Sequence, residues 1–169
     1  MEIVQITRES TPAVRFIGKR YPASANYGAA WGQWWQSGWF EPLDKLPRRA
    51  AINQDSYCAA KRIVGGELEY WIGMFFEPTV DAPEGYDSVD LEALTFAVCW
   101  LKDKPDSPEL TGLAAHERCV AAMRQQGMVR KEDDWCFERY QCPRYTTPDA
   151  DGHVILDYGV AILPAEANL

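Results

Sequence analysis

One carboxylate in this sequence is flanked by aromatic residues. Glu138 follows Phe137 and lies two positions before Tyr140, in a short segment whose pattern predicts a β-strand. Alternation along a strand places Glu138 on one face with Cys136 and Tyr140, and places Phe137 and Arg139 on the other. From the residues alone, a solvent-facing Glu is the simplest interpretation, because Glu side chains are mostly exposed. If the strand instead borders a pocket, the carboxylate could bind a cation or activate water as a general base.

Tryptophan is concentrated in the first quarter of the chain. The sequence contains 7 Trp, and Trp31, Trp34, Trp35 and Trp39 lie close together in it. Tyr27 precedes them on the same predicted helix. One helix cannot bury so many rings against a sheet, so we expect some in the core and others to line a pocket. There, each well-placed ring contributes roughly 0.5–2 kcal/mol to binding a cation.

Trp31 is the first candidate for the pocket wall, with Tyr27 and Trp35 beside it. Further candidates are rings on predicted strands that should border the same pocket. These residues are Tyr70, Phe76, Trp100, Tyr140 and Tyr158. Together with Glu138, they complete the predicted ligand-binding set.

The other reactive side chains do not form a catalytic or metal-binding pattern. The 5 Cys include no C-x-x-C pair, and His116 and His153 share no metal-ligand spacing. His116 lies three residues before Cys119 on a predicted helix, but no third group is placed to orient such a nucleophile. Gly-rich phosphate-binding patterns are absent from the sequence. We therefore expect no metal and no cofactor.

Composition is that of an ordinary globular protein. The 169 residues include 17 Lys+Arg and 25 Asp+Glu, which gives a formal net charge of −8. That length predicts a single domain over 1–169. The acidic balance argues against direct nucleic-acid binding, which needs clustered basic residues. Without an apolar segment long enough for a membrane span or a signal peptide, we expect a cytoplasmic protein with no membrane partner.

The predicted elements follow the order strand, helix, strand, strand, and then repeat it. The first half, about 13–78, contains a strand over 13–21, a helix over 25–39 capped by Ser24, and strands over 56–63 and 67–76. A Pro-rich and Gly-containing connection is predicted over 77–90.

The second half, about 90–164, contains a strand over 91–102, a helix that stops at Gly127, and strands over 135–141 and 154–163. Leu113, Val120 and Met123 are the predicted apolar face of that helix. The pattern predicts an α+β fold built from duplicated β-α-β-β units with pseudo-twofold symmetry.

Four segments in this order resemble the GyrI-like small-molecule-binding domains, which also occur as effector-binding domains of AraC-type and MerR-type multidrug regulators. They are Val14 to Tyr21 followed by Trp31, Ala82-Pro83-Glu84-Gly85-Tyr86 leading to Phe96-Ala97-Val98, Cys136-Phe137-Glu138-Arg139-Tyr140, and Asp157-Tyr158-Gly159-Val160-Ala161-Ile162-Leu163-Pro164. The resemblance covers nearly the whole chain. Many relatives have a Pro shortly before the second of these strands, where this chain reads Asp90-Leu91-Glu92-Ala93.

The resemblance implies an antiparallel sheet with a ligand groove between the halves, and it implies that Glu138 is the acidic contact for lipophilic cations. We therefore expect a stand-alone binding domain, for sensing or sequestration, whose ligand is a hydrophobic or cationic aromatic molecule. In a subset of relatives the same Glu helps to hydrolyse a strained electrophilic ring, so a cofactor-independent hydrolase is the alternative. A third alternative is an acidic module for a basic protein partner, and a homodimer is also left open.

Overall fold

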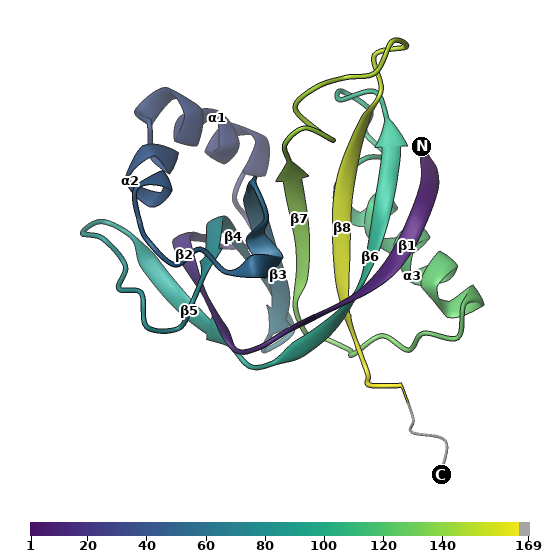
Figure 1. Cartoon of the computed structure of the whole chain (residues 1–169), viewed down its shortest axis with the longest axis horizontal. Coiled ribbons are helices and arrows are strands. Elements are labelled where there is room, and N and C mark those ends of the chain that lie inside the picture. Colours follow the sequence, from purple (N-terminus) through teal and green to yellow (C-terminus); the bar gives the residue numbers. More distant parts are fainter. Residues whose placement is uncertain (166–169) are drawn as a thin grey trace.

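Residues 1–165 are described by a computed structural model, in which eight antiparallel strands form one sheet and the helices cover it (Figure 1). The strands are β1 (Glu2–Thr11), β2 (Val14–Tyr21), β3 (Ser56–Val64), β4 (Glu67–Phe76), β5 (Asp87–Leu91), β6 (Leu94–Asp103), β7 (Cys136–Gln141) and β8 (Val154–Ile162). The helices are α1 (Tyr27–Ser37), α2 (Phe40–Asp44), the 3-10 turn η1 (Ala51–Asn53) and α3 (Gly112–Gln125). The predicted α+β class is confirmed.

The strand order shows the duplication. It is β1-β6-β8-β7-β3-β4-β2-β5. The strands β1 to β4 of the first half correspond to β5 to β8 of the second. When each strand is exchanged with its counterpart, the same order is obtained, read from the opposite edge of the sheet. The pseudo-twofold axis therefore passes between β3 and β7, at the centre of the sheet. Two strands were missed by the sequence prediction: β1 precedes the first predicted unit, and β5 lies in the segment predicted as a connection.

Neither missed strand pairs with the strand that follows it in sequence; each pairs with the corresponding strand of the other half. β1 leads into β2 but pairs with β6, and β5 leads into β6 but pairs with β2. Each repeat is therefore a β-β-α-β-β unit whose first strand extends the sheet of the other unit. The exchange adds an edge strand to each end of the sheet, and the β3–β7 pairing at the centre joins the two halves into one continuous sheet.

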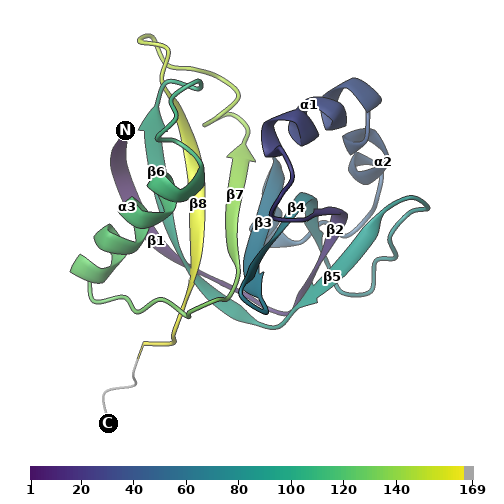
Figure 2. The ribbon, with the colours of Figure 1, turned by 180° about the vertical axis from the view of Figure 1, so that it is seen from behind.

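Rows of directly paired residues identify the sheet face on which Glu138 lies. Ile72 pairs with Ala59, Ala59 with Glu138, Glu138 with Tyr158, and Tyr158 with Cys99. Residues paired in this way point to the same side. Ile72 and Ala59 pack in a core with α1 and α2, whereas Tyr158 and Cys99 pack in a core with α3. The helices of both halves therefore cover one face, as Figure 2 shows from behind. Glu138 lies on this face, on the central strand β7.

The opposite face forms a core that both halves share. Phe16 and Phe75 from the first half pack with Phe96 and Phe137 from the second. Gly159 makes room for the Phe137 ring, since a Cβ at that position would lie 2.2 Å from a ring carbon. This shared core fixes the central strands that carry the candidate site.

Helix ends differ from the prediction by a few residues. α1 is capped by Asn26, not Ser24, and the Asn26 side chain accepts a hydrogen bond from the Ala29 backbone N–H at 3.0 Å. It ends at Gly38, whose φ of 65° is a left-handed conformation that glycine adopts without strain. In α3, Val120 and Met123 are buried as predicted, but Leu113 is 71% exposed. Leu113 is therefore not part of the core.

No helix within residues 1–165 combines the length and the apolar character needed to cross a membrane.

Candidate functional site

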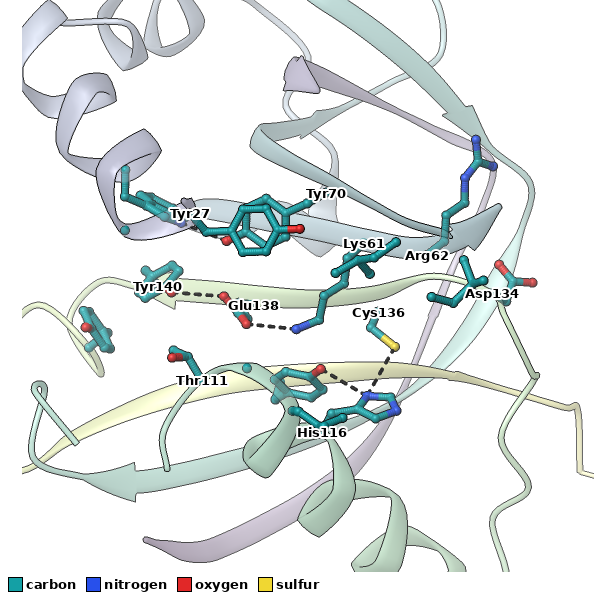
Figure 3. A pocket seen from close by; sticks show the side chains of 18 of the residues that line it. Tyr27, Lys61, Arg62, Tyr70, Thr111, His116, Asp134, Cys136, Glu138 and Tyr140 are labelled. Atoms are coloured by element: carbon teal, nitrogen blue, oxygen red, sulfur yellow. Dashed lines mark hydrogen bonds and ion pairs between the residues drawn. The ribbon is translucent and has the colours of Figure 1, made fainter. Parts of the chain in front are cut away.

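A cleft of about 730 Å³ lies over β3 and β7, between α1 and α3 (Figure 3). Its volume is in the range of small-molecule sites. The lining residues come from both halves of the duplication. They are Tyr27, Gly28, Trp31, Lys61, Arg62, Ile63, Leu68, Tyr70, Pro105, Thr111, Gly112, Leu113, His116, Arg130, Asp134, Cys136, Glu138, Tyr140, Tyr145 and Tyr158.

Glu138 is nearly buried at the base of this cleft, with 3% of its surface exposed. Its Oε1 lies 3.0 Å from Lys61 Nζ, and its Oε2 accepts a hydrogen bond from the Tyr140 hydroxyl at 3.1 Å (Figure 3). A buried carboxylate needs such partners, because desolvation of an isolated charge is costly. Both carboxylate oxygens are therefore engaged by the protein itself.

Lys61 is a site residue that sequence reasoning missed. It lies on β3, where it pairs with Cys136, so it sits two residues along the ladder from the Ala59–Glu138 pair. Its ammonium also lies 4.8 Å from the centre of the Tyr158 ring. The sequence contains no local signal for this contact, because Lys61 and Glu138 come from different halves of the chain.

Aromatic rings form the wall of the cleft on the α1 side. Tyr27 stacks on Tyr70 with ring centres 4.0 Å apart, and Trp31 packs edge-on against Tyr140 at 4.9 Å. The Trp31 indole N–H donates a hydrogen bond to the Tyr70 hydroxyl at 2.9 Å. Tyr145, which was not predicted, continues the row beyond Tyr140 at 4.7 Å. These rings hold one another in place and leave their remaining surfaces toward the cleft.

The cleft tyrosines remain neutral hydrogen-bonding groups. Burial raises the pKa of Tyr140 well above its usual value, and the nearby Glu138 carboxylate acts in the same direction. Burial also raises the pKa of Tyr158 and of Tyr70. The wall therefore offers apolar ring faces and neutral hydroxyl groups.

His116 and Cys136 lie together on the α3 side of the cleft. His116 Nδ1 is 3.1 Å from the Tyr158 hydroxyl oxygen and 3.9 Å from the Cys136 Sγ. Burial, followed by the positive charges of Arg130 and Lys61, lowers the pKa of His116 to about 4. Burial raises the pKa of the Cys136 thiol to about 11. Since the thiolate is the reactive form, this neutral pair is not an activated nucleophile.

Two arginines, Arg62 and Arg130, lie at the end of the cleft near β3 and the α3–β7 connection. Arg62 Nη2 lies 3.3 Å from a Glu69 carboxylate oxygen, and Arg130 Nη1 lies 3.5 Å from one of Glu132. The Nε atoms of both arginines are buried and have no hydrogen-bond partner within residues 1–165. The Arg62 guanidinium lies 4.4 Å from the centre of the Trp135 ring, which belongs to the core of the opposite face, so of the three basic residues in the lining it is Lys61 and Arg130 whose charges lie on the cleft side.

Six of the nine predicted ligand-binding residues line the cleft: Glu138, Trp31, Tyr27, Tyr70, Tyr140 and Tyr158. Three predicted residues lie elsewhere. Trp35 is one position past the buried Trp34, so it turns away, packs beside Phe40 and remains 60% exposed.

Phe76 and Trp100 also lie outside the cleft. Phe76 shares a face with Tyr70 but is fully buried near α2, at the far end of β4. Trp100 alternates with Cys99 and Leu101 on β6 and therefore points to the opposite face, where the Arg144 guanidinium lies 4.2 Å from its ring centre. Alternation along β6 accounts for the placement of Trp100, and distance along β4 accounts for that of Phe76.

A group of polar residues on the β7–β8 connection is separate from the cleft. Asp149, Asp151 and His153 have ligand atoms within 4.8 Å of one another. Asp149 accepts hydrogen bonds from the backbone N–H groups of Asp151 and His153 and lies 2.9 Å from Lys102 Nζ. These contacts account for the group as a stabilised turn.

No protein-family model matches the sequence, and no curated protein matches it. Solved structures do show the same fold. SAV2435, in a structure described as bound to tetraphenylphosphonium, aligns with a TM-score of 0.64 and 13% identity, over 95% of this chain and 94% of that chain.

A transcription regulation protein described as putative, from Staphylococcus aureus MU50, aligns with a TM-score of 0.58 and 13% identity, over 95% and 99% of the two chains. EcmrR, in a complex with DNA, aligns with a TM-score of 0.62 and 12% identity, over 95% of this chain and 58% of that chain. The fold implied by the resemblance to GyrI-like domains is therefore confirmed.

Proposed function

We propose that this chain binds amphipathic aromatic small molecules in the cleft between α1 and α3, and that Glu138 is the charged contact for a cationic part of the ligand. The observation that carries the proposal is a carboxylate, 3% exposed, at the base of a cleft walled by rings. A buried charge beside a cavity of about 730 Å³ is an arrangement typical of ligand sites, where few polar groups fix the orientation.

The ring wall supports an aromatic ligand with a positive charge. Tyr27, Trp31 and Tyr140 expose ring surface next to Glu138, and a cation over such a face gains roughly 0.5–2 kcal/mol. Tetraphenylphosphonium, the molecule bound to SAV2435, has this combination of charge and rings. We propose a related ligand class for this chain, with sensing or sequestration as its role.

The decisive experiment compares a cation with a neutral molecule of similar shape. Calorimetric titration with tetraphenylphosphonium and with triphenylphosphine oxide should show tighter binding of the cation. Glu138→Gln should remove roughly 1–3 kcal/mol of cation affinity and leave the neutral molecule nearly unaffected, since the negative charge that attracts the cation is lost.

Glu41→Gln is a matched control, because Glu41 is exposed and pairs with Lys45 on α2, outside the cleft. If cation affinity is the same in the wild type and in Glu138→Gln, the proposed role of Glu138 is wrong.

The alternative hydrolase function is tested by adding an electrophilic aromatic ligand to the same proteins and measuring product formation. Product beyond one equivalent per protein, lost in Glu138→Gln, would favour turnover over binding.

A further inference from the structure

Glu138 is already paired with a cationic side chain of the protein, that of Lys61. The Lys61 ammonium lies 3.0 Å from Glu138 Oε1, and the Lys61 side chain is 12% exposed. A ligand cation that contacts this carboxylate must therefore displace, or share the carboxylate with, an ammonium that water reaches poorly. Figure 3 shows Lys61 extending from β3 to the carboxylate across the cleft base.

A simple lipophilic cation would leave that ammonium without a partner. Removal of one member of a buried pair exposes the desolvation cost of the other. Tetraphenylphosphonium carries no group that could accept a hydrogen bond from Lys61. By contrast, a ligand with both charges could satisfy both residues. Its acidic group could pair with the Lys61 ammonium while its positive group replaces Lys61 beside Glu138.

The surroundings of Lys61 favour such an acidic group. On the cleft side, the lining contains Lys61 and Arg130 as cations and Glu138 as a carboxylate, while the Arg62 guanidinium packs on Trp135 of the opposite face. Asp134 pairs with Lys131 at 2.7 Å, and Arg130 pairs with Glu132 at 3.5 Å. A ligand cation that takes the place of Lys61 at Glu138 therefore leaves the Lys61 ammonium unpaired inside the cleft, although the chain as a whole carries a net charge of −8.

Arg130 adds a second donor near Lys61. Both side chains act electrostatically on His116 and on Cys136, which places the two cations around the same part of the cleft. The Nε of Arg130 is buried and has no hydrogen-bond partner in the described part of the chain. Anionic oxygen atoms are the natural acceptors for such donors.

We propose that Lys61 is a specificity-determining residue, which makes the cleft select aromatic molecules that carry an acidic group together with a cationic body over molecules that are purely cationic. This inference rests on the proposed function, because it concerns the same site. It adds the ligand class, a zwitterionic aromatic molecule, and assigns the acidic group to Lys61 and Arg130.

Rhodamine B and its ethyl ester provide the test, because they differ in one carboxylate on the same cationic ring system. Their dissociation constants should be measured by fluorescence anisotropy at neutral pH for the wild type, Lys61→Met and Lys61→Arg. We expect the wild type to prefer the acid by roughly tenfold, the gain typical of one charged hydrogen bond. Lys61→Met should reverse the preference by binding the ester more tightly and the acid more weakly, whereas Lys61→Arg should keep it.

The ratio of the two constants within one preparation does not depend on how much of a variant is folded. An equal ratio in the wild type and in Lys61→Met would overturn the inference while leaving the cleft as the binding site. Two other results would contradict the proposed function as well. Either neither dye binds, or both dyes bind to Trp31→Ala as tightly as to the wild type. The second result would show that the cleft is not the binding site.

Discussion

Glu138 and Arg139 are neighbours on β7, are both buried and charged, and point to opposite faces of the sheet. Arg139 is fully buried and is satisfied entirely by protein. It donates to Asp157 at 2.8 Å, to both carboxylate oxygens of Glu9 at 2.9 Å and to the Ile52 carbonyl at 2.8 Å. Glu138 has one ammonium and one hydroxyl as partners and faces a cavity.

The difference separates a buried charge that supports the fold from one that faces a cavity, as the proposed role of Glu138 requires. The Arg139 network joins β1, β7, β8 and η1, and Arg144 adds a further pair to Asp157 at 2.6 Å. Arg139 and Asp157, at its centre, are fully buried. On the cleft face, Lys61 is a side chain that a ligand could replace. Burial and charge alone therefore do not identify a binding residue, and the decisive property is what the charged atoms face.

The largest expected effect concerns Arg139. Arg139→Met should lower the free energy of unfolding by about 3–5 kcal/mol, since it leaves the carboxylates of Glu9 and Asp157 with fewer partners. Urea denaturation followed by Trp fluorescence measures this change. The affinity of the folded fraction for tetraphenylphosphonium should be that of the wild type. A loss below about 1 kcal/mol would contradict the structural role assigned to the network.

The next effect is the pH dependence of stability on the cleft face. The pKa of His116 is about 4 in the folded chain, against an ordinary value of 6.5. Below pH 6.5 the unfolded chain therefore binds a proton that the folded chain does not. This contribution to stability is present above pH 6.5 and is lost as the pH falls toward 4.

We expect a decrease of about 1–2 kcal/mol over that range, because partial exposure of His116 reduces the full effect of the shift. Urea denaturation at several pH values, in the wild type and in His116→Gln, isolates this contribution from the carboxylates. An equally steep dependence in both proteins would show that His116 is not its source.

The smallest expected effect is that of Trp35. Trp35→Ala should change the free energy of unfolding by about 0.5 kcal/mol, because the ring is mostly exposed. Its effect on ligand affinity should not be measurable by calorimetry, since Trp35 lies outside the cleft. A clear loss of affinity would extend the binding site beyond the cleft and weaken the contrast between cleft and surrounding surface.

The sequence was sufficient for the central part of the fold. β2, β4 and β8 have apolar residues on both faces, which marks strands inside a sheet. β1 and β5 were missed because edge strands carry many polar and exposed residues and resemble loops. Their exchange between halves could not be predicted, since strand pairing depends on contacts between distant segments.

The same reason limits prediction of the site. Alternation correctly grouped Glu138 with Cys136 and Tyr140, because that grouping depends on one strand. Lys61 was missed because its relation to Glu138 depends on the register between β3 and β7. Trp100 was named as a candidate because its strand was expected to border the groove, but alternation with Cys99 places its ring on the opposite face.

The exchange of β1 and β5 determines how the cleft can adapt to a ligand. With β1 hydrogen-bonded along β6, and β5 along β2, each half holds a strand that leads directly into the other. The two-residue connections 12–13 and 92–93 and the central β3–β7 ladder join the two halves, so they cannot swing apart about a hinge without breaking that ladder. Molecules of different size must then be accommodated by rotamer changes at the cleft rim, where Leu113 is exposed and long basic side chains can reorient. The backbone acts as a fixed frame, and selectivity among ligands can change by single substitutions in the lining without altering the fold.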